Sequence, residues 1–178
     1  MAYVVLFSAV FGLRRREAAM LDIGVALREA RVDGAIDIRR GTKGGRGRSV
    51  ERLIPCGAEQ IQALISAKNL FRYQQCLIPS NISLKYFNIQ ISNVCLPILK
   101  KHGISRLHEL RVFYACERYR ELTGCSPPCN RQGGDNVPSH QSDERAREII
   151  SQELGHSRIQ IVSSYVGRKI RMRGGGDE

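Results

Sequence analysis

Two short strand-like segments flank a glycine-rich stretch, and this arrangement limits the folds that the chain can adopt. VDGAIDIRR (32–40) and RSVERLIPC (48–56) read as strands, and GTKGGRGR (41–48) between them reads as the turn of a β-hairpin. The remaining periodic segments have the apolar spacing of helices. The sequence therefore predicts one domain with a mainly α fold and one small antiparallel β-sheet, in the α+β class.

Helices are expected on both sides of the hairpin. The apolar opening AYVVLFSAVFG reads as a buried helix, and RRREAAML continues it after a Gly-Leu-Arg turn. Gly124 is placed to end one helix, and Ser142 or Asp143 can cap the next, which should run to about Leu154. The expected helices cover residues 2–21, 58–71, 84–101, 106–124, 142–154 and a short last segment that carries Tyr165.

The charge of the chain indicates a polyanionic partner. Its 178 residues include 28 Lys and Arg against 17 Asp and Glu, a formal net charge of +11, and 22 of the 28 cations are arginine. Guanidinium groups suit forked contacts with phosphate oxygens, and nucleic acid is the commonest polyanion. The alternative is a cationic protein whose charge only keeps it soluble.

Membrane and secretory features are missing from the sequence. No apolar run is long enough to span a bilayer, and the apolar opening lacks the basic leader and cleavage pattern of a secretory signal. The six cysteines stand mostly inside apolar segments, which is typical of free thiols in a reducing compartment. These features predict a cytoplasmic protein without a membrane partner.

Residues 125–142, CSPPCNRQGGDNVPSHQS, read as a loop inserted in the domain. They hold three Pro and two Gly but almost no aliphatic side chain. Cys125 and Cys129 could join His140 in a zinc site, but the spacing is not the usual one and a fourth ligand is missing. We therefore expect no metal and no other cofactor. The segment 169–178 is expected to be a flexible tail because it is polar and Gly-rich.

Three segments carry residues that could address one phosphate. Arg14 stands at the start of a helix, and Glu17, one turn on, can hold its guanidinium. Lys43 is the lysine of the hairpin tip, which is not a P-loop because the GK[ST] ending is absent. His108 and Arg111 are three positions apart and so share a helix face. Each pattern alone also fits a solvated charged surface.

A fourth segment, LGHSRIQIVSSY, contains His156 and Tyr165. The two residues are nine positions apart, so a straight helix would place them on opposite faces. A shared site therefore requires a break between them, and a short loop around residues 157–158 would supply it.

The order and spacing of these residues resemble those of the tyrosine recombinases, the phage integrase family. The resemblance reaches from about residue 3 to residue 168 and covers the catalytic domain of that family. It implies a recombinase-like catalytic domain over residues 1–168. The matching positions are Arg14 in GLRRRE, Lys43 in the hairpin, His108 and Arg111 in HELR, His156 in LGH, and Tyr165.

The resemblance implies a site-specific recombinase or integrase of a phage or mobile element. Such an enzyme cleaves and rejoins double-stranded DNA through a 3′-phosphotyrosine intermediate without a metal, with Tyr165 as the nucleophile. Arg14 and Arg111 would stabilise the transition-state charge, and Lys43, desolvated against DNA between them, would protonate the departing 5′ oxygen. His108 would accept the phenol proton or bind the phosphate, and His156 would donate a hydrogen bond to a non-bridging oxygen.

Further expectations concern assembly. The resemblance implies a tetramer on DNA in the bacterial cytoplasm or nucleoid, and a monomer when the chain is isolated. It also implies that Tyr165 lies on a mobile segment and can be displaced in a free monomer.

Two departures from the family pattern stand out. Arg111 and His156 are 45 positions apart, and the 125–142 stretch accounts for the excess. We expect this stretch to form a surface excursion directed away from the catalytic pocket. We also expect this chain to lack the N-terminal core-binding domain that the family carries.

Three alternatives remain open. The first is a type IB topoisomerase-like enzyme, which shares the chemistry but relaxes DNA alone. The second is a DNA-binding remnant or regulator of the same family that has lost activity. The third is a basic RNA-binding or ribosome-associated protein, although its candidate strands contain no aromatic residue for base stacking.

Overall fold

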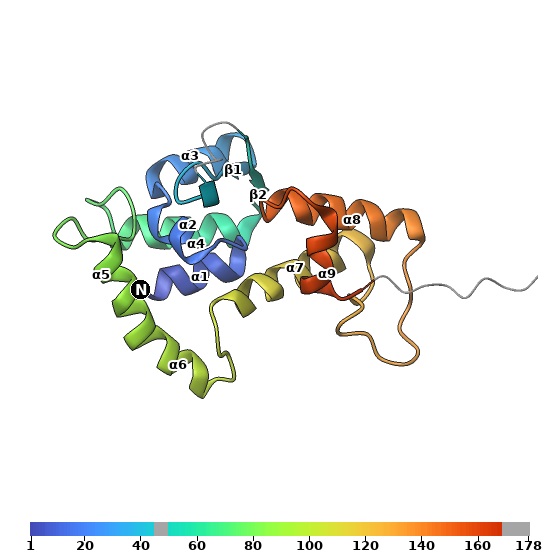
Figure 1. Ribbon diagram of the computed structural model, residues 1–178. Coiled ribbons are helices and arrows are strands. Elements are labelled where there is room, and N and C mark those ends of the chain that lie inside the picture. Colours follow the sequence, from blue (N-terminus) through green and yellow to red (C-terminus); the bar gives the residue numbers. More distant parts are fainter. Residues whose placement is uncertain (45–49, 169–178) are drawn as a thin grey trace, which may run out of the picture.

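The protein is mainly helical, with a two-stranded antiparallel sheet formed by residues 35–37 and 53–55 (Figure 1). The structure, a computed structural model, describes residues 1–44 and 50–168. The predicted mainly α fold with a small antiparallel sheet is thus confirmed. The elements are α1 (Ala2–Val10), α2 (Arg15–Met20), α3 (Ile23–Val32), β1 (Ala35–Asp37), β2 (Leu53–Pro55), α4 (Ala58–Leu70), α5 (Leu84–Gln90), the π-helical turn Ile91–Cys95, α6 (Leu96–Lys101), α7 (His108–Thr123), α8 (His140–Glu153), the 3-10 turn Ile159–Val162 and α9 (Ser163–Val166).

The hairpin of β1 and β2 has the predicted antiparallel pairing. Ile36 lies opposite Ile54, and both side chains are fully buried. The flanking positions of β2 are exposed, which is the alternation expected of a strand with one covered face. Part of the predicted glycine-rich turn, residues 45–49, lies outside the described residues, as does the expected tail 169–178.

Helix α1 forms the centre of the core because its residues are apolar on every face. Val4, Phe7 and Phe11 are fully buried. The rings of Phe7 and Phe11 meet edge to face at 5.5 Å between centroids, and burial of such side chains stabilises the fold by about 1.5–3 kcal/mol each. This core gives the shorter elements around it a fixed support.

Helix α7 crosses the molecule and packs on α1 at one side and on α8 and α9 at the other (Figure 1). Its buried residues include Arg111, Ala115 and Tyr119, which recur every fourth position and so share one face. Gly124 ends the helix in the left-handed conformation, as predicted. Helix α7 therefore connects α1 on one side with α8 and α9 on the other.

Several boundaries differ from the sequence prediction. The predicted helix over residues 2–21 is interrupted between α1 and α2, and Arg14 is the residue that precedes α2. Helix α3 was not predicted, and Asp22 begins it by accepting a hydrogen bond from the Val25 amide at 3.0 Å. The predicted caps of α8 are wrong, because Ser139 caps it through the Ser142 amide at 3.1 Å.

The predicted helix over residues 84–101 is present and is interrupted by the π-helical turn Ile91–Cys95. It forms an arm that extends away from the body of the molecule (Figure 1). None of the helices in the described part of the chain combines the length and apolar character needed to cross a membrane.

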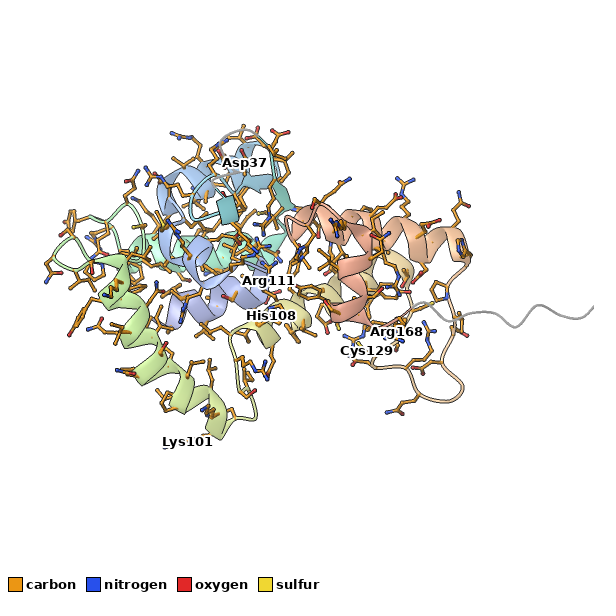
Figure 2. All side chains as sticks on the ribbon, viewed as in Figure 1. Asp37, Lys101, His108, Arg111, Cys129 and Arg168 are labelled. Carbon is orange, nitrogen blue, oxygen red and sulfur yellow. The ribbon has the colours of Figure 1, made fainter. Side chains whose placement is uncertain are left out.

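The inserted stretch is a loop between α7 and α8, as predicted, but its expected direction is only partly right. The backbone amide of Cys129 donates to the Val166 carbonyl at 3.0 Å, so the first part of the loop packs on α9. Figure 2 shows Cys129 beside the end of the segment that follows α9, at Arg168. This first part of the loop therefore supports the helix that carries Tyr165.

Candidate active site

Glu17 is a buried carboxylate that gathers the arginines of the site. It lies in the first turn of α2 and is fully buried, and its Oε1 accepts a hydrogen bond from Arg14 Nη1 at 2.6 Å. Its Oε2 accepts the Arg14 backbone amide at 2.7 Å, as a glutamate does in the first turn of a helix. The Arg14 guanidinium, which is 29% exposed, is thus held at the start of α2 while it still reaches solvent.

Arg111 reaches the same carboxylate from α7. Its Nη1 lies 3.7 Å from Glu17 Oε2 and donates to the Gly12 carbonyl, and its Nη2 donates to the Leu154 carbonyl at 3.1 Å. Figure 2 shows Arg111 and His108 at the N-terminal end of α7, near the middle of the molecule. Residues almost a hundred positions apart in the sequence therefore bring two guanidinium groups to one place.

The charges of this cluster perturb each other. Burial, together with the neighbouring Arg14, lowers the pKa of Arg111 to about 10. Burial alone would raise the pKa of Glu17, but Arg52 and Arg14 outweigh it and hold that pKa below its ordinary value. At neutral pH the cluster therefore keeps its carboxylate ionised and Arg111 protonated.

Tyr165 lies between two histidines beside this cluster. Its hydroxyl is 3.1 Å from His156 Nε2, and its ring centroid is 5.1 Å from that of His108 and 5.5 Å from that of His156. The tyrosine is only 5% exposed. The expectation that it is displaced in a free monomer is therefore wrong for this structure.

The predicted break between His156 and Tyr165 brings the two side chains together. Helix α8 ends at Glu153, Gly155 takes a left-handed conformation with φ of +66°, and the 3-10 turn leads into α9. A side chain at position 155 would be strained by that φ and would approach Arg52. This turn reverses the chain direction, so that both side chains face one point.

Both histidines are held neutral by their surroundings. Burial, together with the neighbouring Arg111, Arg14 and Arg52, lowers the pKa of His156 to about 4. Burial and the same arginines Arg111 and Arg14 also lower the pKa of His108. At neutral pH the imidazole of His156 is therefore able to accept a hydrogen bond from the Tyr165 hydroxyl.

Lys43 is not brought to the cluster. It is exposed in the loop after β1 and makes no hydrogen bond or ion pair with another residue that the structure describes. Arg14 and Arg111 turn toward Glu17 in this structure, and the expected desolvation of the Lys43 amine against DNA stays a prediction. The loop itself is close, since a Cβ atom on Gly41 would lie 2.7 Å from the Arg16 carbonyl oxygen.

Arg52 belongs to the cluster but was missed by reasoning from the sequence. Its Nη1 donates to Glu17 Oε1 at 2.8 Å, and its Nε donates to the Glu153 carbonyl at 2.7 Å. A signal was available, because Arg52 precedes Ile54 by two positions and alternation along a strand puts both on the covered face. An arginine on such a face needs a buried partner.

Arg147 is a second buried arginine that was missed, and it fixes α9. Both oxygens of Asp143 accept from its Nε, at 3.0 and 2.9 Å. Its Nη1 donates to Ser163 Oγ at 3.3 Å and to the Gly167 carbonyl at 3.0 Å, which are at the two ends of α9. Together with Cys129, this arginine holds the short helix of Tyr165 in place.

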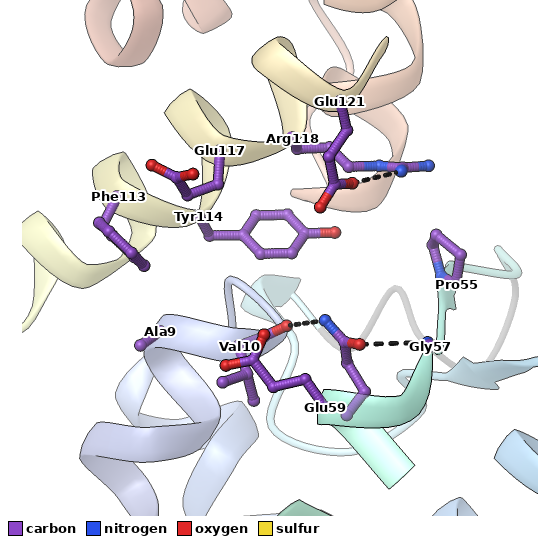
Figure 3. Close-up of a pocket in the computed structure, with 11 residues that line it drawn as sticks. Ala9, Val10, Pro55, Gly57, Glu59, Phe113, Tyr114, Glu117, Arg118 and Glu121 are labelled. Atoms are coloured by element: carbon purple, nitrogen blue, oxygen red, sulfur yellow. Dashed lines mark hydrogen bonds and ion pairs between the residues drawn. The ribbon is translucent and has the colours of Figure 1, made fainter.

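Two hollows lie outside the cluster. One, of about 410 Å³, lies between α7 and the start of α4 and is lined by Glu59, Glu117 and Glu121, with Tyr114 at its floor (Figure 3). These carboxylates would repel a phosphate. The other, a shallow groove of about 550 Å³, is lined by Arg15, Arg16 and Lys85 without a carboxylate, and it begins next to Arg14.

Metal-binding arrangements are not found among residues 1–44 and 50–168, where no group of three His, Cys, Asp or Glu side chains could hold an ion. Cys129 instead lies 3.7 Å from Cys116 between sulfur atoms. Comparisons with protein-family models, with curated proteins and with solved structures return no significant match. The chemistry of the site must therefore be argued from its geometry.

Proposed function

We propose that the chain is the catalytic domain of a tyrosine recombinase, with the fold of that domain, and that it cleaves and rejoins DNA strands through a 3′-phosphotyrosine. One observation carries the proposal. Arg14 and Arg111 share Glu17, and the same arginines lower the pKa of His156, which contacts the Tyr165 hydroxyl at 3.1 Å. Five of the six expected residues, the nucleophile Tyr165 among them, therefore form one cluster.

The proposed chemistry uses a phenol as the attacking group. Tyr165 Oη attacks a phosphorus atom of the DNA backbone, the phosphotyrosine bond forms, and the bond to the 5′ oxygen breaks. Negative charge grows on the non-bridging oxygens, and the guanidinium groups of Arg14 and Arg111 stabilise it. The reverse reaction with the 5′ hydroxyl of another strand rejoins the DNA.

Proton transfer follows from the positions of the two imidazoles. His156 is neutral and touches the phenol, so it accepts the proton of Tyr165 in this proposal. His108 packs on the same ring and is free to bind a phosphate oxygen. The leaving 5′ oxygen receives its proton from Lys43, whose exposed loop reaches the site when DNA covers it.

The surface next to the site suits a DNA backbone. Arg15, Arg16 and Lys85 continue the positive charge of Arg14 along the shallow groove between α2 and α5. With a formal net charge of +11, the chain would attract double-stranded DNA mainly through phosphates. Assembly as a tetramer on DNA is part of the proposal.

A trapping experiment tests the proposal. The protein is mixed with end-labelled duplexes of randomised sequence, each with one nick, so that cleavage beside the nick releases a short strand and leaves the adduct covalent. Mass spectrometry is expected to find the DNA on the peptide of Tyr165. Tyr165→Phe should abolish the adduct because it removes the attacking oxygen.

A matched control separates this outcome from damage to the fold. Tyr86 is exposed on α5, so Tyr86→Phe should trap DNA at the wild-type level. An adduct of equal yield with Tyr165→Phe would remove this residue from the mechanism. Failure of every folded form to trap DNA would contradict the proposed activity.

A further inference from the structure

Arg52 enters the site from the β-hairpin with a fixed backbone. Its amide donates to Asp37 Oδ1 at 2.9 Å, and its carbonyl accepts from the Ile38 amide at 3.1 Å. The side chain is 6% exposed and runs from the edge of the sheet into the interior. The hairpin therefore fixes the backbone from which the guanidinium extends into the site.

The guanidinium of Arg52 connects the two halves of the candidate site. Its Nη1 holds Glu17, the carboxylate that also binds Arg14 and Arg111. Its Nε holds the carbonyl of Glu153, the last residue of α8 before the turn to His156. Arg111 also joins Glu17 to the end of α8, through the Leu154 carbonyl, and Arg52 makes the corresponding connection from the hairpin side, through Glu153.

The turn at Gly155 is shaped around this arginine. A Cβ atom at position 155 would lie 3.0 Å from Arg52 Cδ and 3.1 Å from Arg52 Nε. The chain passes so close to the arginine because the position has no side chain. The place of His156, the next residue, consequently depends on where Arg52 lies.

Arg52 is suited to position other groups and not to touch a phosphate. Its Nη2 is buried and has no hydrogen-bond partner within the described part of the chain. A buried ion pair with an unpartnered N–H contributes little net stability. Net stabilisation is therefore a weak explanation for this arginine, and the geometry that it imposes on its neighbours is a better one.

We propose that Arg52 is a positioning residue of the reaction: it fixes the distance between the Glu17-bound arginine pair, Arg14 and Arg111, and the turn that carries His156. The proposal rests on the proposed function. The fork of the guanidinium is essential to it, because two different atoms of that group bind the two halves.

The electrostatics of His156 provide a readout that needs no DNA. The charged or titratable groups that face this imidazole are Arg111, Arg14, Arg52, Glu17 and the Tyr165 hydroxyl. Arg52 is one of the cations that lower the pKa of His156, after burial, Arg111 and Arg14. Loss of its charge should raise that pKa toward the ordinary value of 6.5.

Two variants separate the charge of Arg52 from its fork. Arg52→Gln removes the charge, and Arg52→Lys keeps the charge on one nitrogen that cannot bind both halves. Arg118→Met is the matched control, because Arg118 binds Glu153 through the side-chain carboxylate and does not contact Glu17. Folding of each variant is checked by circular dichroism, the His156 ring is titrated by NMR, and adduct formation on the nicked duplex pool is measured under single-turnover conditions.

The expected results differ among the variants. In Arg52→Gln the pKa of His156 rises and the maximal rate of adduct formation falls about ten- to a hundredfold, with the half-saturating DNA concentration changed less than about twofold. In Arg52→Lys the pKa of His156 stays low but the rate still falls. Arg118→Met leaves both near the wild-type values.

Two outcomes would overturn the inference. One is a folded Arg52→Gln with the His156 titration and the rate of the wild type. The other is a wild-type rate in Arg52→Lys, which decides the matter even when the Gln variant does not fold. If the wild type forms no adduct at all, the proposed function fails, and the NMR titration still shows whether Arg52 sets the surroundings of His156.

Discussion

The Nε2 atom of His156, in the loop after α8, and the hydroxyl of Tyr165, in α9, lie 3.1 Å apart, although the two residues are nine positions apart. The contact depends on a turn at Gly155 and on supports behind α9, namely Arg147 and the backbone of Cys129. The phenol therefore has a neutral imidazole as its nearest polar partner. This differs from the expected roles, in which His108 was the candidate for the phenol proton.

The two histidines should differ in their effect on cleavage. His156→Gln is expected to slow adduct formation by about a hundredfold or more, since it removes the group in contact with the phenol. His108→Gln should have a smaller effect, because His108 contacts the tyrosine through ring packing. Single-turnover rates on the nicked duplex pool measure both. The reverse order of effects would return the role of proton acceptor to His108.

Acid should destabilise the protein through His156. Its pKa is about 4 in the folded chain and 6.5 as the ordinary value, so the unfolded state binds more protons between these limits. The free energy of unfolding is therefore unaffected by His156 above pH 6.5. It decreases as the pH falls toward 4, by roughly 2 kcal/mol for this partly exposed residue. Urea unfolding across this range measures the effect.

A pair of variants isolates that contribution. His156→Gln should reduce the dependence of unfolding free energy on pH, whereas His102→Gln, at an exposed position after α6, should leave it unchanged. An equal slope in the wild type and in His156→Gln would show that other groups cause the acid sensitivity.

DNA binding should be strongly salt-dependent and should use the groove beside Arg14. The double change Arg15→Ala and Arg16→Ala removes two cations of that groove, so the slope of log affinity against log salt should become less steep by about 2. Fluorescence anisotropy with a duplex of random sequence gives the slope. Arg72→Ala, an exposed arginine after α4, is the control. A wild-type affinity that hardly changes with salt would contradict a phosphate-based interface.

The two parts of the inserted loop should contribute differently. Replacing residues 130–137 with Gly and Ser should leave cleavage near the wild-type rate, because the contacts of Cys129 with α9 are kept. Replacing 126–129 in the same way should destabilise the protein by about 1–2 kcal/mol and slow adduct formation, since the support of α9 is disturbed. Thermal unfolding and trapping assays measure both. A wild-type rate and stability in the 126–129 variant would mean that this part of the loop does not support Tyr165.

Turn residues and apolar spacing, which are read over a few neighbouring positions, predicted part of the fold. The hairpin, the helix that ends at Gly124 and the break after His156 follow from turn residues and apolar spacing, and the structure has all three. Helix α3 escaped because its buried face is built from Ile23 and the small residues Ala26 and Ala30, which give a weak apolar period.

Long-range features could not be predicted in the same way. The partners of Arg52 are 35 and 101 positions away, and no spacing rule connects them. Lys43 was expected to act beside the two arginines when DNA is bound. The order of the motifs along the chain indicates which loop holds this lysine but not where the loop lies in space. The excursion 125–142 was expected to turn away from the site, and its contact with Val166 depends on how α7 and α9 pack.

The close approach of Gly41 to α2 gives the hairpin a fixed pivot. A Cβ atom there would lie 2.7 Å from the Arg16 carbonyl oxygen and 2.9 Å from the Glu17 amide, so the loop is pressed against the helix that begins after Arg14. Lys43 is two residues beyond this point, a span of at most about 7 Å of extended backbone. The distance of the Lys43 amine from Gly41 is therefore limited to this backbone span plus the length of one lysine side chain. The amine stays close to the start of α2, where Arg14 lies.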